Sequence, residues 1–379
     1  MPANKLEAQE VPQMAGAPPA LDAYAPDKAA WHLDRIADMR KGKQAVPVNI
    51  QLIISDTCNE NCGYCAYRAS DGLSSAQFGG LDKQGRPTMN PDRLIPADKV
   101  KELLHDARTL GVRSITWTGG GEPTVHLAHL ELFEYALNLG FECSLNTNGL
   151  VLRPGWSNIL PRFTYIRFSF DGSTPEEYAA IRGTVPANFE RVRQNMAAVV
   201  GAVKDAGSPC VVGAGYVVTP EFAESTAKGV ELLRETGVAY VRLAAQQSVD
   251  VAKTYGDRFD LARRSSARAR ELSTPGFRVI SLFEEAIGRK MQSPFCGFQQ
   301  LVLYIGGNVA AFRCCYTAYM PVGKVGDLSK MRLVDWFNSP EKHGAYAEFD
   351  ARNCTTCPLA TKNEAIAALL REPLHANFP

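Results

Sequence analysis

The feature that most constrains the fold is an alternation of short apolar runs with amphipathic segments, which begins near residue 46 and repeats six times. The apolar runs are predicted as strands, and the segments that place apolar residues three and four apart are predicted as helices. The predicted strands span residues 48–54, 114–117, 142–146, 165–170, 210–218 and 240–244. The predicted helices span residues 97–110, 126–139, 175–182, 188–204 and 221–235. Consecutive units of this kind predict an α/β fold, a partial (β/α)6 barrel of the TIM type with a parallel sheet.

The rest of the chain flanks this barrel. Residues 1–45 are predicted as an amino-terminal region that consists of a disordered arm over 1–24, rich in Pro, Ala and Gln, and a short amphipathic helix over 26–41. The barrel is predicted over 46–272. Beyond it the alternation stops and cysteines return, so residues 273–379 are predicted as a small carboxyl-terminal iron–sulfur domain. The insert at 66–96 is too long for an ordinary strand-to-helix connection and is predicted as a lid or a substrate loop.

Composition narrows the class of protein. The 379 residues are 45% hydrophobic, which is ample for a buried core, and a formal charge of +1 gives no overall attraction to nucleic acid or acidic membranes. The sequence has no apolar run of 18 or more residues and no export signal, so we expect a cytoplasmic protein without a membrane partner. Its 10 cysteines include close-spaced pairs, which favours metal or cluster ligation over disulfides.

Three of these cysteines, Cys58, Cys62 and Cys65, lie directly after the first predicted strand. In barrels of this kind the chemistry takes place on loops that follow the carboxyl ends of strands. Three thiolates can hold three irons of a 4Fe-4S cube and leave the fourth iron open for a ligand. The alternative is structural zinc, which needs four ligands, and the loop contains no His to complete the set.

The loop after the second predicted strand reads Thr-Gly-Gly-Gly-Glu-Pro over residues 118–123. Glycines let a ligand approach the backbone, and the Glu122 carboxylate can accept a hydrogen bond from an amine. A flexible turn is the alternative. Because this loop follows a barrel strand next to the cysteine loop, ligand binding is favoured.

A second cysteine set lies near the carboxyl end of the chain: Cys296, Cys314 or Cys315, Cys354 and Cys357. Four cysteines can close a second cube or hold zinc. Apolar runs around central glycines predict a β-hairpin over residues 301–312. Alternation along a strand lets only one of Cys314 and Cys315 point inward, and Cys314 is predicted as the ligand.

Cys143 and Cys210 lie inside apolar strands and are predicted as core residues. A thiol that donates hydrogen to a substrate is the alternative for either of them.

Together, the three-cysteine loop and the Gly-Gly-Glu-Pro segment resemble radical S-adenosylmethionine (SAM) enzymes, from about residue 46 to the carboxyl end. The resemblance implies that Cys58, Cys62 and Cys65 hold a 4Fe-4S cluster whose open iron binds the amine and carboxylate of SAM. It implies reductive cleavage of SAM to a 5′-deoxyadenosyl radical that abstracts hydrogen from a substrate. A reductant such as flavodoxin or ferredoxin is the implied partner.

The resemblance also implies contacts to SAM for residues beyond the cysteines. These are Tyr64 near the adenine, Gly120, Gly121 and Glu122 at the methionine amine, Asn148 beside the adenosine, Ser169 at the ribose or methionine, and Arg182 at the carboxylate. Alternatives remain for two neighbours on this stretch. Asp171 is suited to capping the helix that starts at Pro175, and Arg182 to an exposed helix surface.

The carboxyl-terminal cysteines resemble the shortened auxiliary-cluster domain called twitch rather than the longer SPASM pattern, because no cysteine follows Cys357. This implies a second 4Fe-4S cluster on Cys296, Cys314, Cys354 and Cys357, with zinc as the alternative.

Residues 52–68, the glycine loop and the last residues of the chain are similar to radical proteins of tailed phages, some of which are implicated in rearranging amino-acid-modified thymine in DNA. This implies an isomerase that acts on modified thymidine in the host cytoplasm. The alternatives are a maturase of a ribosomal peptide, a carbohydrate epimerase or dehydrogenase, and a non-catalytic metal-binding scaffold. No leader-binding domain is recognisable in the first 45 residues, which disfavours a peptide substrate.

Overall fold

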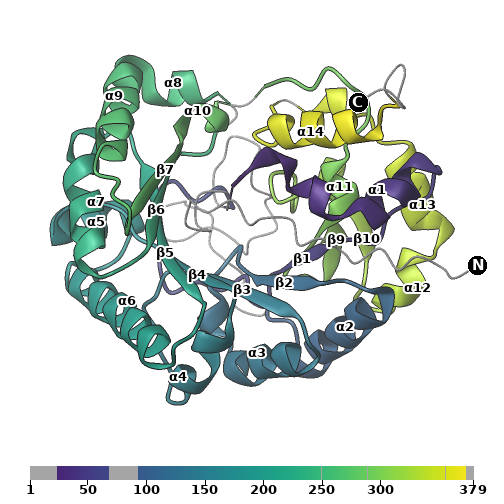
Figure 1. Cartoon of the computed structure of the whole chain (residues 1–379), viewed down its shortest axis with the longest axis horizontal. Coiled ribbons are helices and arrows are strands. Elements are labelled where there is room, and N and C mark those ends of the chain that lie inside the picture. The colour runs from purple at the N-terminus through teal and green to yellow at the C-terminus, as the bar shows by residue number, and fades with distance from the viewer. Residues whose placement is uncertain (1–23, 68–92, 249, 288, 355, 373–379) are drawn as a thin grey trace, which may run out of the picture.

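The computed structural model describes residues 24–67, 93–248, 250–287, 289–354 and 356–372. Nearly all of the predicted disordered arm and most of the predicted lid lie outside these described residues. The named strands form one ten-stranded sheet with the spatial order β10-β9-β8-β1-β2-β3-β4-β5-β6-β7. Figure 1 shows the sheet curving around an interior, with helices around its outer side. The predicted α/β partial-barrel fold is confirmed.

The barrel wall is a run of strands that each pair in parallel with the next one along the chain. The strands are β1 (Asn49–Leu52), β2 (Ser114–Trp117), β3 (Glu142–Thr147), β4 (Tyr165–Ser169), β5 (Val211–Val218), β6 (Tyr240–Ala245) and β7 (Arg278–Leu282). The first six overlap the predicted strands. The alternation did not predict β7, because the helix before it carries mainly arginine, alanine and serine instead of a continuous apolar stripe.

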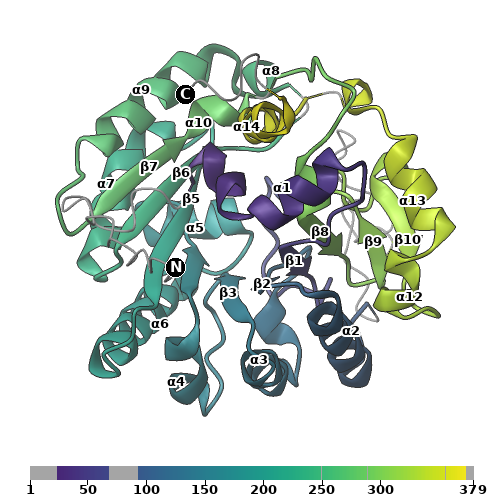
Figure 2. The same cartoon turned by 45° about the vertical axis from the view of Figure 1, so that its right-hand side comes forward.

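Helices cover the outer face of this wall (Figures 1 and 2). They are α2 (Ala97–Leu110), α3 (His129–Asn138), α4 (Trp156–Ile159), α5 (Pro175–Arg182), α6 (Ala187–Asp205), α7 (Thr226–Glu235), α8 (Val251–Tyr255), α9 (Phe259–Arg270) and α10 (Phe283–Ala286). On α2, the buried Val100, Leu103 and Leu104 recur at helical spacing and pack in the same core as Trp117. The helix ends at Gly111, whose φ of 90° favours glycine.

The other face of the strands lines the barrel interior and is polar. Asn49 Nδ2 donates to Ser114 Oγ at 2.9 Å and to Thr116 Oγ1 at 3.1 Å, and Ser144 Oγ donates to Thr116 Oγ1 at 3.0 Å. Successive side chains of a strand point to opposite faces, so strands with apolar residues toward the helices present hydroxyls and amides to the interior.

The carboxyl-terminal region continues the same sheet. β8 (Val302–Ile305) pairs in parallel with β1, while β9 (Ala310–Phe312) is antiparallel to β8 and β10 (Lys324–Asp327) is antiparallel to β9. The predicted hairpin is therefore confirmed. The helices of this region are α11 (Phe298–Leu301), α12 (Leu333–Phe337), α13 (Pro340–Ala347) and α14 (Ala360–Leu370). A separate domain from residue 273 stays a prediction, since the sheet runs through both parts.

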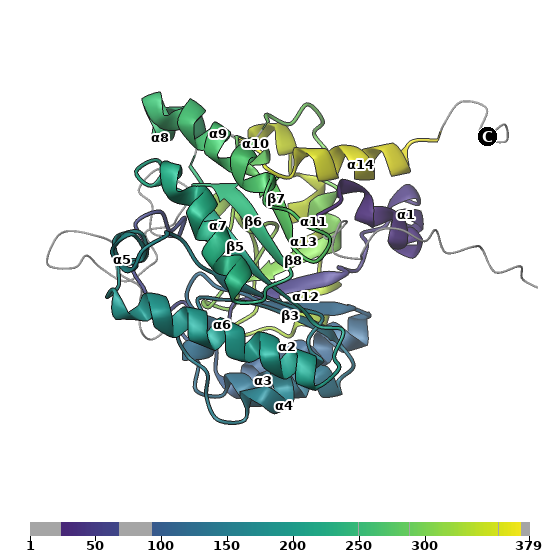
Figure 3. The same ribbon diagram turned by 60° about the vertical axis from the view of Figure 1, so that its left-hand side comes forward.

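The segment ahead of the barrel is a 3₁₀ helix (Pro26–Trp31) followed by α1 (Leu33–Arg40), which confirms the predicted helix in two pieces. It packs on α14: Figure 3 shows the two helices side by side, and Arg40 Nη2 donates to Leu369 O at 2.6 Å. None of the helices in the described ranges has the length and apolar character needed to cross a membrane.

Candidate functional site

The cysteine loop after β1 sits on the carboxyl end of α5. Asn61 N donates to Arg182 O at 3.0 Å and Gly63 N donates to Ile181 O at 3.2 Å, so the last carbonyls of α5 hold the loop. Gly183 follows with a φ of 58°, and a Cβ there would lie 2.1 Å from Asn61 O. The Ile-Arg-Gly sequence at the end of α5 therefore lets the cysteine loop approach the end of that helix closely.

Arg182 of α5 holds the cysteine loop in place through a buried network of ion pairs. The Arg182 Nε donates to Glu60 Oε2 at 2.9 Å, and Nη1 donates to Asp171 Oδ2 at 2.9 Å. Tyr178 OH donates to Glu60 Oε1 at 2.8 Å. Because Arg182 is only 4% exposed and is paired with two carboxylates, its interpretation as an exposed helix residue is wrong. Its contact with the SAM carboxylate stays a prediction.

Asp171 does not cap α5, so that alternative is wrong as well. The cap is Thr174, whose side chain accepts from Glu177 N. Asp171 instead accepts from Val217 N at 2.6 Å and joins Tyr64 and Arg182. A carboxylate with a guanidinium, a phenol and a backbone N–H within reach is better satisfied there than at an exposed helix start.

Tyr64 lies in the same network. Its hydroxyl donates to Asp171 Oδ2 and accepts from Arg182 Nη1, each at 2.6 Å, and burial raises the pKa of Tyr64 well above its usual value. The phenol is therefore neutral and held by α5. Its predicted place near the adenine stays a prediction.

The glycine loop after β2 packs against the start of the cysteine loop. Gly121 N donates to Ser55 O at 3.2 Å and Glu122 N donates to Thr57 O at 2.9 Å. A Cβ on Gly121 would lie 2.2 Å from Thr57 O, and one on Gly119 would lie 1.7 Å from Gly121 O. The glycines therefore serve a close approach of two backbones, and a merely flexible turn does not describe them. The contact of Gly120 and Gly121 with SAM stays a prediction.

Glu122 ties the loops after β2 and β3 together. It is 2% exposed; its Oε1 accepts from Thr124 N at 3.0 Å and Thr147 Oγ1 at 2.7 Å, and its Oε2 accepts from Asn148 N at 2.7 Å. Burial raises the pKa of Glu122, although these donors oppose the shift. Asn148 Nδ2 donates to Asn59 Oδ1 at 2.6 Å and to Cys58 Sγ at 3.9 Å. Asn148 therefore contacts the cysteine loop directly, and Glu122 is joined to that loop through Asn148.

Ser169 ends β4 and is half-buried. Its register places it opposite Gly215 of β5, which in turn lies opposite Arg242 of β6. Ser169 thus lies at the carboxyl ends of the strands, and its contact with SAM stays a prediction.

The cysteine loop fits an iron–sulfur cube. Cys58, Cys62 and Cys65 are half-buried free thiols, and burial together with the Glu122 carboxylate raises the pKa of Cys58 to about 12. Thiols in such a place need a cationic group to become thiolates. Within the described ranges, no three His, Cys, Asp or Glu side chains are grouped for a single metal ion. The thiols of a cube each bind a different iron, so they do not need to converge on one point.

The second cysteine set gathers from three separate segments. Cys296 precedes α11, Cys314 follows β9, and Cys354 and Cys357 precede α14. Backbone hydrogen bonds join the chain before α11 to the chain before α14, since Ala351 N donates to Pro294 O at 2.8 Å and Cys357 N donates to Arg289 O at 2.9 Å. Burial, together with the nearby charge of Cys314, raises the pKa of each of the other three thiols.

Cys314 and Cys315 lie in a turn after β9, so strand alternation does not separate them as expected. Tertiary packing does. Cys315 packs against the buried cluster of Tyr304 and Tyr319, whereas Cys314 neighbours the other three cysteines. This arrangement favours Cys314 as the ligand, which stays a prediction. Cys143 and Cys210 are buried in the main core, as predicted.

Sequence reasoning missed Glu60 and Asp56. Glu60 lies between two cysteines of the loop, and the only signal was an acidic residue in a short metal-binding stretch. Asp56 is fully buried and pairs with Arg93 Nη2 at 2.9 Å, and Tyr319 OH donates to it. Since Tyr319 OH also accepts from Gly307 N at 3.0 Å, Asp56 links the cysteine loop to the carboxyl-terminal hairpin.

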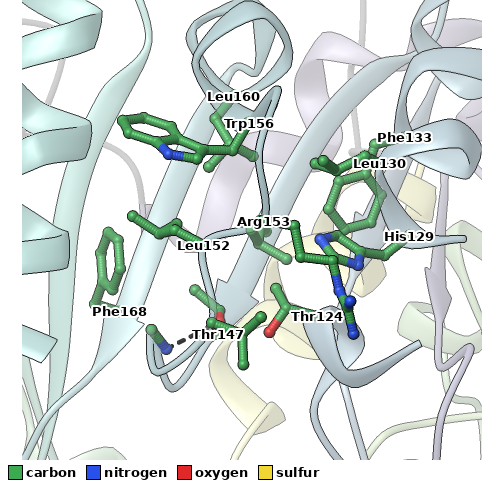
Figure 4. A pocket seen from close by; sticks show the side chains of 13 residues that line it. Thr124, His129, Leu130, Phe133, Thr147, Leu152, Arg153, Trp156, Leu160 and Phe168 are labelled. Carbon is green, nitrogen blue, oxygen red and sulfur yellow. Dashed lines mark hydrogen bonds between the residues drawn. The ribbon is translucent and has the colours of Figure 1, made fainter. Parts of the chain in front are cut away.

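A mainly apolar pocket lies beside the hydrogen bonds of Glu122, on the helix side of the sheet. Figure 4 shows it lined by His129, Phe133, Leu152, Trp156 and Phe168, which come from α3, β4 and the chain around α4. Thr124 and Thr147, which donate to Glu122, form its base. The pocket therefore lies behind Glu122, on the outer side of the strands. Its mainly apolar lining does not suit the binding of a polar cofactor.

Fold and site define an α/β partial-barrel protein with a thiol-rich loop at the carboxyl end of its first strand. Residues 52–230, a little under half of the chain, match the family model described as "Radical SAM superfamily", so this segment is similar to the domain of that superfamily.

Curated relatives match parts of the chain. It is 26% identical over 154 residues to a probable GTP 3′,8-cyclase of Methanosarcina acetivorans, which covers 40% of this chain and 42% of the relative. It is 39% identical over 101 residues to the mycofactocin maturase MftC of Mycobacterium tuberculosis, which covers 26% of each. These matches span less than half the length of either relative.

Solved structures share the fold. Streptococcus suis SuiB bound to the precursor peptide SuiA matches with a TM-score of 0.58 at 17% identity, covering 88% of this chain and 74% of SuiB. The enzyme anSMEcpe with bound AdoMet matches with a TM-score of 0.54 at 18% identity, covering 78% of this chain and 79% of that one. At these identities the likeness concerns the fold alone.

Proposed function

We propose that this protein is a radical SAM enzyme that cleaves S-adenosylmethionine reductively and uses the 5′-deoxyadenosyl radical for hydrogen abstraction. One observation carries the proposal: the loop of Cys58, Cys62 and Cys65 is clamped between α5 and the glycine loop, inside the segment that matches the family. When bound, the 4Fe-4S cluster supplies the electron and an open iron for SAM.

The protein's own residues position this loop. The Arg182 network holds it from α5, and Glu122 with Asn148 holds it from the loops after β2 and β3. The proposed contacts with SAM lie at the carboxyl ends of the barrel strands and are made by Tyr64, Gly120, Gly121 and Ser169. Since so much of the loop is fixed by buried contacts, little reorganisation is needed when the cofactor binds.

A second 4Fe-4S cluster on Cys296, Cys314, Cys354 and Cys357 is part of the proposal. Their neighbouring, half-buried thiols support it. Structural zinc on the same four thiols is the alternative. A flavodoxin or ferredoxin is the proposed reductant, and the cytoplasm the proposed compartment.

The test is anaerobic reconstitution followed by iron analysis and SAM turnover. Two cubes predict about eight irons per chain, and dithionite should trigger release of 5′-deoxyadenosine. Bound zinc without SAM cleavage would instead identify a non-catalytic metal-binding scaffold.

For the substrate we propose an amino-acid adduct of thymidine in DNA, rearranged by an isomerase reaction. The proposal rests on the resemblance to tailed-phage radical proteins that the sequence analysis drew from residues 52–68, the glycine loop and the last residues of the chain. Nucleoside mass analysis of DNA from cells lacking this protein tests it, with accumulation of the unrearranged adduct as the expected result. Unchanged nucleosides would contradict it.

The second candidate is maturation of a ribosomal peptide, which the 39% identity to a mycofactocin maturase over 101 residues favours. A short precursor-peptide gene beside the gene for this protein would support it. Crosslinking or epimerisation of that peptide by the reconstituted protein is the direct test.

A further inference from the structure

The barrel interior contains two arginines that lack acidic partners. Arg167 on β4 and Arg242 on β6 are half-buried, and none of the ion pairs among described residues includes either of them. The Arg242 Nε is buried without a hydrogen-bond partner. Arg167 Nη1 donates to Tyr24 OH at 3.0 Å, a neutral acceptor.

Arg182 and Arg313, which are more deeply buried than this pair, have protein acceptors. Arg182 pairs with Glu60 and Asp171, and Arg313 donates to Gln299 Oε1 and to the carbonyl of Val322. A guanidinium removed from water without an acceptor costs stability. Two such groups that face the same space leave room for an acceptor that is not among the described residues.

Two glycines of β5 lie in register with this pair. Gly213 and Gly215 occupy successive interior positions of β5, opposite Arg167 and Ser169 of β4. A Cβ on Gly213 would lie 2.2 Å from the ring of Tyr240, and one on Gly215 would touch the Arg167 side chain at 3.5 Å. Gly213 therefore lets the Tyr240 ring lie across β5, whereas a Cβ at Gly215 would only be in ordinary van der Waals contact with Arg167.

Tyr24 completes the group from the segment ahead of the barrel. Its ring meets Tyr240 edge-on with centroids 6.4 Å apart, and the Arg242 guanidinium lies 5.9 Å from the Tyr24 ring centre. Burial opposes ionisation, yet Arg167 and Arg242 lower the pKa of Tyr24. The interior around the phenol is thus electropositive.

Its location is suited to a substrate. Arg242 lies in the strand layer of Gly215 and Ser169, and Ser169 ends β4 at the carboxyl edge of the sheet, where the first cysteine loop follows β1.

We propose that Arg167, Arg242 and the hydroxyl of Tyr24 form an anion-binding subsite in the barrel interior, which takes a phosphate or carboxylate group of the substrate. Guanidinium groups present paired donors that match the oxygens of either anion. The assignment as a substrate site rests on the proposed radical SAM function. A nucleotide phosphate and an amino-acid carboxylate share this chemistry and are separated by the test.

The test is calorimetric titration of the reconstituted protein with sodium phosphate and, separately, with sodium acetate at constant sodium chloride. We expect saturable binding of one anion per chain, weakened at least tenfold in Arg242→Gln and in Arg167→Gln, as expected for loss of a charge-assisted hydrogen bond. Arg242→Lys should retain part of the binding, and Tyr24→Phe should weaken it a few-fold. Arg263→Gln, an exposed arginine on α9, is the matched control and should bind as wild type.

Preference for phosphate identifies a phosphoryl substrate, and preference for acetate a carboxylate. Absence of binding, or binding that neither arginine variant weakens, overturns the proposal. If Arg242→Gln does not fold, Arg242→Lys and Tyr24→Phe carry the same comparison. Dithionite-dependent release of 5′-deoxyadenosine is measured on the same samples: its absence with anion binding intact would refute the radical SAM function and leave the anion subsite standing.

Discussion

The two cysteine sites differ in how the chain builds them. The first takes three thiols from one eight-residue loop, clamped by the carbonyls of α5 and the Glu122 network. The second takes thiols from three segments between Cys296 and Cys357 that only the tertiary fold brings together. The comparison teaches that a locally encoded ligand set still needs distant residues to hold its loop, whereas a dispersed set depends on the fold for its existence.

Removing one ligand of the first site should give the largest effect. Cys62→Ala is expected to abolish release of 5′-deoxyadenosine and to leave about four irons per chain in the second site, because the remaining thiols cannot hold a complete cube. Iron analysis and SAM turnover measure both. Full turnover in this variant would contradict the assignment of the loop.

The second site should separate two adjacent thiols. Cys314→Ala is expected to lose the second cluster, about four irons, whereas Cys315→Ala keeps it, because Cys315 packs against the Tyr304 cluster and Cys314 neighbours the other three cysteines. Iron content and the cluster spectrum of the two variants measure the difference. Equal loss in both, or loss only in Cys315→Ala, would reverse the ligand choice.

The loop clamp should be weakened most by removing its buried cation. Arg182→Met leaves Glu60 and Asp171 buried without their partner, and breaking such a pair costs about 3–5 kcal/mol of unfolding free energy. Urea unfolding of the reconstituted protein measures this, and cluster loss should precede global unfolding. Arg193→Met removes a partly exposed pair and is the control, with a cost of at most about 1 kcal/mol. Similar losses in both would contradict the network's role.

A smaller effect is expected at the end of α5. Gly183→Ala combines left-handed backbone strain with a Cβ 2.1 Å from Asn61 O, so it should cost about 1–3 kcal/mol and loosen the first cluster. Gly207→Ala is the matched control, since Gly207 has the same φ of 58° and nothing within 4 Å of its added Cβ. Cluster retention during chelator challenge compares them. Equal retention would mean that the helix end does not hold the loop.

Much of the architecture was predictable because its signals are local in the chain. The periodicity that sets α2 over residues 97–110 and the spacing of Cys58, Cys62 and Cys65 both lie within short windows. β7 escaped prediction because α9 before it lacks a continuous apolar stripe. The partner of Arg182 escaped because Glu60 lies 122 residues away, and nothing in either sequence context indicates the pairing.

The sequence by itself determined the order of strands and helices, the cysteine loop after the first strand and the glycine loop after the second. Only the tertiary structure decided that the glycines serve backbone packing and that Cys314 rather than Cys315 neighbours the other three cysteines. It also decided that Arg167 and Arg242 both lie beside Tyr24, with no acidic partner among the described residues. The physical reason is range. Periodicity and ligand spacing act between neighbours in the chain, whereas ion pairing and close packing depend on strand register and on loops that meet only after folding.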